Sequence, residues 1–128
     1  MDIGEFKNNK MYCEADFCED EIILSLKENS EFNIHIWEGY IRDIFDKAAL
    51  DGEMWAGFTR DFHEIKGAFS RKNGNKIQIQ NIEEYLADLL GYCEKEFDFE
   101  ETREVFNLMV DFLRYAMMTG QTVVVQIV

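Results

Sequence analysis

The residues of this chain best suited to nucleophilic or metal chemistry are its two histidines and three cysteines. His63 is followed by Glu64, but Gly67 stands where the His-Glu-x-x-His pattern of zinc hydrolases needs its second histidine. The cysteines are odd in number and lack the spacing of a zinc site: Cys13, Cys18 and Cys93. We therefore predict free thiols in a reducing cytoplasm and no metal site.

A catalytic site built from the same residues stays open as an alternative. A Cys–His pair needs its members close in space and not in sequence, so a site beside Cys93, His35 or His63 is compatible with the chain. The phosphate-binding and nucleophile-elbow motifs are absent, and 26 acidic residues make any acid–base pairing uninformative. We predict no catalytic and no cofactor-binding residues, and a protein that is not an enzyme.

The net charge of −13 is the most unusual property of the sequence, with 26 acidic residues against 13 basic ones. A field of this sign repels nucleic acid and anionic membranes, and it attracts basic proteins from beyond contact range. The alternative interpretation is that the charge only keeps the protein dissolved. No apolar run reaches the roughly 20 residues of a membrane span, and the N-terminus lacks a signal-peptide pattern, so we expect a cytoplasmic protein.

Two acidic clusters interleave carboxylates with aromatic residues and are our candidates for binding a partner. The first surrounds Phe17 and contains Glu14, Asp16, Glu19 and Asp20. The second surrounds Phe97 and Phe99 and contains Glu94, Glu96, Asp98, Glu100 and Glu101. Carboxylates spaced along an ordered surface can match the Lys and Arg groups that a nuclease uses to bind phosphates. Each cluster taken alone is also compatible with a merely solvated junction between helices.

The last thirty residues are expected to form the centre of the fold. Apolar residues cover most of the circumference of a helix over 100–118, which predicts a helix in the middle of the domain. Asp98 is placed as its N-cap with Glu101 three residues on, and Gly120 suits a left-handed stop. The β-branched run Thr122–Val128 then predicts a strand.

The remaining elements fit a single domain over residues 1–128. Residues 22–26 and 76–80 predict strands, 52–69 predicts a helix, and Asn81 with Glu84 forms a capping box for another. A further helix ends near Leu50 and starts at residue 31 or 37, because the alternation over 32–36 is also compatible with a strand. We expect an α+β fold, with about four helices packed on one face of a small three-stranded sheet.

As a small, strongly acidic α+β domain without proline or a catalytic motif, the chain resembles the immunity proteins of bacterial toxin systems. It is most similar to those of contact-dependent growth inhibition. The resemblance is carried by the Trp37-Glu-Gly-Tyr40 helix opening, the acidic junction over 94–101 and the strand-forming end over 119–128. It implies a stoichiometric inhibitor that covers the active site of a toxin or blocks its substrate surface. The expected partner is a basic toxin, such as a nuclease domain. A phage-type mimic of nucleic acid, or a small enzyme or ligand carrier, are the alternatives.

Overall fold

The computed structural model describes residues 3–12, 21–45, 57–59 and 76–127. Its elements, in chain order, are η1 (Ile3–Phe6), β1 (Asn9–Tyr12), β2 (Glu21–Leu26), β3 (Asn29–Trp37), α1 (Glu38–Phe45), β4 (Lys76–Gln78), α3 (Ile82–Leu90), α4 (Thr102–Thr119) and β5 (Val123–Ile127). The predicted helix over 52–69 lies largely outside these ranges, as does the end of the helix predicted to reach Leu50.

The sheet is mixed and has five strands in the order β1-β3-β2-β5-β4, so the prediction of three strands was wrong. β1 runs parallel to β3, and the other neighbours are antiparallel. Residues 32–36, whose alternation was compatible with a strand, lie within β3, which confirms the strand alternative. β1, with the sequence Asn-Lys-Met-Tyr, is a polar edge strand whose side chains are largely exposed, so it carries no hydrophobic pattern.

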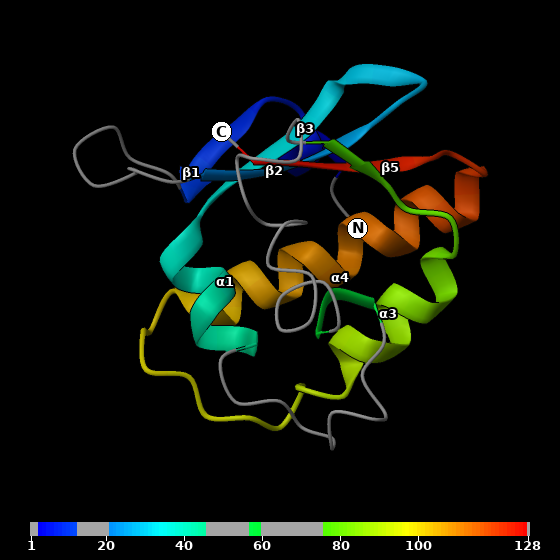
Figure 1. Cartoon of the computed structure of the whole chain (residues 1–128). Coiled ribbons are helices and arrows are strands. Elements are labelled where there is room, and N and C mark those ends of the chain that lie inside the picture. The colour runs from blue at the N-terminus through cyan, green and yellow to red at the C-terminus, as the bar shows by residue number, and fades with distance from the viewer. Residues whose placement is uncertain (1–2, 13–20, 46–56, 60–75, 128) are drawn as a thin grey trace.

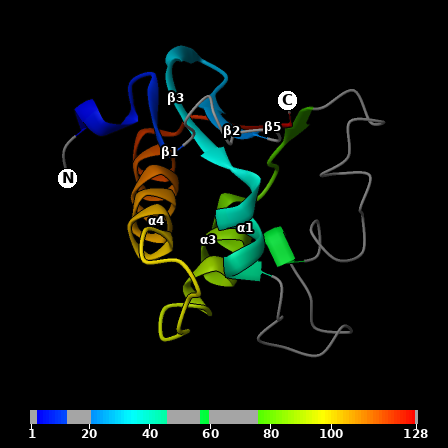
Figure 2. The same cartoon turned by 90° about the vertical axis from the view of Figure 1, so that its left-hand side faces the viewer.

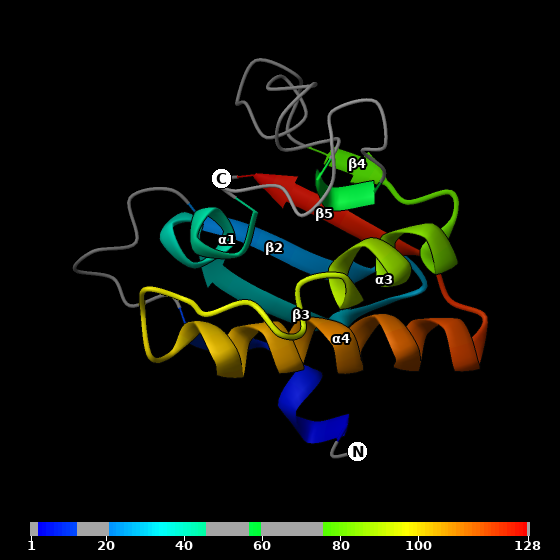
Figure 3. The same ribbon diagram turned by 90° about the horizontal axis from the view of Figure 1, so that it is seen from below.

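Helices α1, α3 and α4 all cover one face of the sheet (Figures 1 and 3), as the sequence predicted. Alternate residues of β2 and β3 are buried against them, for example Leu24 and Ile34. α4 is the longest of the described helices, and its C-cap is Gly120, whose φ of 68° confirms the left-handed stop. No helix in the described ranges combines the length and apolarity needed to cross a membrane.

The N-terminal segment contributes to this core, which the polar sequence of residues 1–10 did not predict. Phe6 is fully buried, and its ring lies 5.5 Å from the rings of Phe112 and Tyr115 on α4. Figure 2 shows η1 on the same side of the molecule as α4. Phe6 is a single buried residue and does not belong to a repeating apolar pattern, so its burial cannot be predicted from periodicity.

Asn81 caps α3 as predicted, since its side chain accepts a hydrogen bond from the Glu84 backbone N–H at 3.1 Å. The helix ends at Leu90, one residue before Gly91. Cys93 therefore falls in the following turn and is exposed, although helical spacing from Leu86 and Leu89 would continue the buried stripe of this helix to it.

Candidate protein-binding surface

The acidic segment, residues 94–101, links α3 to α4 and runs along the helical side of the molecule, below α1 in Figure 1. All five of its predicted partner-binding side chains are exposed: Glu94, Glu96, Asp98, Glu100 and Glu101. The residues of the other predicted cluster, Glu14, Asp16, Glu19 and Asp20, lie outside the described ranges. Among the described residues, the acidic segment is thus the predicted partner-binding cluster that the structure places at the surface.

Asp43, from the last turn of α1, anchors the acidic segment to the rest of the fold. Its carboxylate accepts hydrogen bonds from the backbone N–H groups of Asp98 at 2.9 Å and Phe99 at 3.0 Å, and from the Thr102 hydroxyl at 2.6 Å. The prediction that Asp98 caps α4 was wrong, because the helix starts at Thr102, and the preceding Glu101 makes no side-chain capping bond. A carboxylate distant in sequence binds the N–H groups just before this helix instead.

The ionised form of Asp43 is stabilised by these contacts. Burial of the carboxyl group opposes ionisation and would by itself raise its pKa. Hydrogen bonds from Thr102, Asp98 and Phe99, together with the positive charge of Lys95, outweigh burial and hold the pKa below its ordinary value. The acidic segment is therefore fixed by a charged group at neutral pH.

The two basic residues beside the acidic surface point toward backbone carbonyls. Lys95 donates to the carbonyl oxygens of Asp43 and Ile44, both at 2.8 Å, at the C-terminal end of α1. Arg103 donates to the carbonyls of Cys93 at 2.9 Å and Lys95 at 2.7 Å. The positive charges are thus used to hold the backbone in place, and helix C-termini favour such cations.

The exposed carboxylates of the segment are consequently not paired with these two basic residues, so their charge is available to a partner. None of the five makes an ion pair with a lysine, arginine or histidine in the described parts of the chain. Carboxylates that form no ion pairs, on a backbone fixed by hydrogen bonds, make a preorganised surface in which negative charges outnumber positive ones.

The two aromatic residues of the segment have different surroundings. Phe97 packs inward, with the Arg103 guanidinium 4.6 Å from its ring centre. The ring of Phe99 lies 5.6 Å from that of Trp37 and 5.9 Å from that of Tyr40, yet this residue is 43% exposed. Phe99 therefore forms the outer edge of an aromatic cluster beside the carboxylates, where a partner can cover it.

Gly39 is required for this cluster, because the Trp37 side chain folds over it. A Cβ atom at position 39 would lie 2.4 Å from the indole ring. We expect Gly39→Ala to displace the indole and to destabilise the fold by about 1–3 kcal/mol. The side-chain N–H peak of Trp37 in a ¹H–¹⁵N NMR spectrum, assigned with Trp37→Phe, should move. A variant with an unmoved peak and unchanged stability would contradict this packing.

The residues singled out for catalysis do not come together in the described parts of the chain. His35 lies on the face of the sheet away from the helices, where its Nδ1 contacts the Glu21 carboxylate and its Nε2 lies 2.9 Å from the Asn33 side-chain oxygen. Cys93 belongs to the helical layer, so these two residues form no nucleophile pair. His63, Cys13 and Cys18 fall outside the described ranges. No group of three or more potential metal ligands occurs among the described residues.

Comparisons of this chain with protein-family models, with curated proteins and with solved structures found no match.

Proposed function

We propose that the protein is an inhibitor of the immunity type, which binds a basic toxin in the cytoplasm and neutralises it by contact. The observation that carries this proposal is the acidic segment itself: five exposed carboxylates without cationic partners among the described residues, on a backbone held by Asp43 and Lys95. A nuclease domain is the basic partner that fits best, because its substrate is also a row of negative charges.

A preorganised acidic surface suits this task for a kinetic reason. An inhibitor of a lethal enzyme must bind before the enzyme acts, and charge complementarity raises association rates toward about 10⁸–10⁹ M⁻¹s⁻¹ at low salt. Because the carboxylates stand on an ordered segment, little conformational entropy is lost when the complex forms. The chain would be present in a 1:1 complex that keeps phosphate away from the toxin's basic residues.

Phe99 supplies the apolar contact that charge alone lacks. Aromatic residues that become covered at an interface contribute a large share of its binding energy. We expect Phe99→Ala to raise the dissociation rate of the complex about tenfold and to leave the association rate nearly unchanged. Met118→Ala is the control, since Met118 is 73% exposed and lies near the opposite end of α4. Equal effects of both substitutions on dissociation would exclude Phe99 from the interface.

The proposed function is tested by co-expression with a candidate toxin from the adjacent gene. Protection of the cells, and a complex that survives gel filtration in low salt, are the expected results. Absence of both would remove the proposal.

A further inference from the structure

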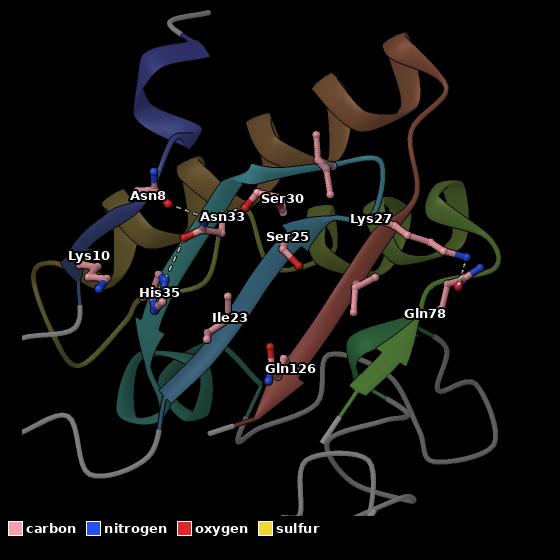
Figure 4. Close-up of a pocket in the computed structure, with 12 residues that line it drawn as sticks. Asn8, Lys10, Ile23, Ser25, Lys27, Ser30, Asn33, His35, Gln78 and Gln126 are labelled. Atoms are coloured by element: carbon pink, nitrogen blue, oxygen red, sulfur yellow. Dashed lines mark hydrogen bonds between the residues drawn. The ribbon is translucent and has the colours of Figure 1, made fainter. Parts of the chain in front are cut away.

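A hollow of about 720 Å³ lies on the face of the sheet opposite the helices (Figure 4). Ile23 and Val124 give it an apolar floor, and Ser25 and Gln126 add hydrogen-bonding side chains. Lys10 and Lys27 lie at its opposite ends (Figure 4). A volume of this size is within the range of small-molecule sites, about 300–1,000 Å³.

The charge of the hollow is opposite to that of the chain as a whole. None of the described residues that line it is acidic, although acidic residues outnumber basic ones 26 to 13 in the sequence. The Lys10 amine has no hydrogen-bond or ion-pair partner among the described residues. The Lys27 amine makes one long hydrogen bond, 3.3 Å, to the Gln78 side-chain oxygen. Both amines therefore have donors left for a ligand.

Two acidic residues near the hollow, one on β2 and one in the turn between β2 and β3, already have contacts of their own. Glu21 contacts the His35 ring, and Glu28 accepts a hydrogen bond from the Thr122 backbone N–H at 2.8 Å. Neither carboxylate forms an ion pair with Lys10 or Lys27 in the described structure, although the hydrogen bond from Thr122 and, to a smaller extent, the charge of Lys27 lower the pKa of Glu28.

The wall near Lys10 is held by side-chain hydrogen bonds, whereas the centre of the hollow offers polar groups that have no partner among the described residues. The Asn33 amide nitrogen donates to Asn8, Ser30 and Glu31 oxygens at 2.8–3.2 Å, which turns its oxygen toward His35. By contrast, the Ser25 hydroxyl and the Gln126 amide have no partner among the described residues. A fixed wall beside unsatisfied donors and acceptors is the arrangement of a ligand site.

We propose that this hollow binds a small organic anion with an elongated body. A phosphate or carboxylate group would pair with Lys10, Lys27 or both, while the body lies on Ile23 and Val124 and bonds to Ser25 or Gln126. A small ligand fits better than nucleic acid or an acidic protein, because repulsion by the net charge of −13 grows with the charge of the ligand.

The test is an NMR titration of the full chain with two anions and their uncharged counterparts: adenosine monophosphate against adenosine, and suberate against the corresponding diol. Saturable shifts of the β2 and β5 peaks with at least one anion, and none with the uncharged compounds, are expected. The anion that binds distinguishes a phosphate ligand from a carboxylate ligand. Absence of shifts with both anions, or equal binding of the uncharged compounds, would overturn the proposal.

Matched variants complete the test. Lys10→Gln and Lys27→Gln should each weaken anion binding about two- to fivefold. Arg114→Gln, an exposed site on α4, makes the same change in net charge and should leave it unaltered. Equal weakening by all three would assign the effect to overall charge and overturn the site. The hollow shares no residue with the acidic segment. A negative result for anion binding would therefore leave the proposed inhibitor function unaffected.

Discussion

Reversal of three carboxylates in the acidic segment, with Glu96, Asp98 and Glu100 all changed to Lys, is expected to slow association with a basic partner about a hundredfold at low salt. Electrostatic steering contributes roughly ten- to a thousandfold to such association rates, and these side chains form no ion pairs in the described structure. The difference from wild type should shrink as salt is added, because exposed charges are screened beyond a Debye length of about 10 Å at 0.1 M. Stopped-flow mixing over a salt series measures both effects.

The control reverses the same number of carboxylates elsewhere on the surface. Glu5 on η1, Glu31 on β3 and Glu83 on α3 are exposed, and changing all three to Lys alters the net charge equally. We expect this variant to slow association only a few fold. Equal rates for the two variants would mean that the partner responds to the total charge and not to the acidic segment. Circular dichroism should show that both variants are folded.

Replacement of Asp43 by Asn is expected to destabilise the protein by about 2–4 kcal/mol at pH 7. The two carboxylate oxygens accept different backbone N–H groups, one from Asp98 and one from Phe99. An amide supplies only one acceptor oxygen, so in either orientation its NH₂ group meets one of these donors. Charge-assisted hydrogen bonds contribute about 1.5–3 kcal/mol each, and the donor left without a partner adds a further cost. Urea unfolding measures the change.

Asp98→Asn is the matched control, because the same substitution is made at the residue that the sequence placed as the cap. The Asp98 side chain is exposed, and the structure gives it no capping bond, so its replacement should cost less than about 0.5 kcal/mol. A larger cost for Asp98→Asn than for Asp43→Asn would contradict the anchoring of the segment by Asp43.

The effect of Asp43→Asn should also depend on pH. A carboxyl group whose pKa is lower in the folded than in the unfolded state stabilises the fold above the unfolded pKa. That contribution is lost as pH falls through the folded-state pKa. The pKa of Asp43 is lowered in the fold, so the difference between wild type and Asp43→Asn should be full at pH 7 and shrink below about pH 4. Urea unfolding at several pH values measures it.

The sequence was sufficient to predict those helices and strands that contain many residues in a regular apolar or β-branched pattern. α4 is buried over most of its circumference, and β5 is a β-branched run, so both were predicted closely. The α+β class and the placement of helices on one face followed from these patterns. β1 was missed because an exposed edge strand needs no hydrophobic alternation, and Phe6 was missed because it is a single buried residue.

The sequence suggested which carboxylates could bind a partner, but it did not predict the contacts that hold their backbone in place. Composition alone pointed to the carboxylates of the segment, and the structure places all five at the surface. The role of Asp43 depends on a contact 55 residues away in the chain, which no local pattern contains. The inward direction of Lys95 and Arg103 likewise depends on where the end of α1 and the preceding turn lie in space.

The central claim, that this chain acts by presenting an acidic surface to a basic protein, is tested most directly by binding kinetics. The measurement is the association rate of the purified protein with a candidate basic toxin, such as a basic product of a neighbouring gene, over a range of salt concentrations. We predict a stable complex whose association rate falls steeply as salt rises. A chain that binds no basic protein at low salt, or a complex whose association rate is independent of salt, would contradict the account.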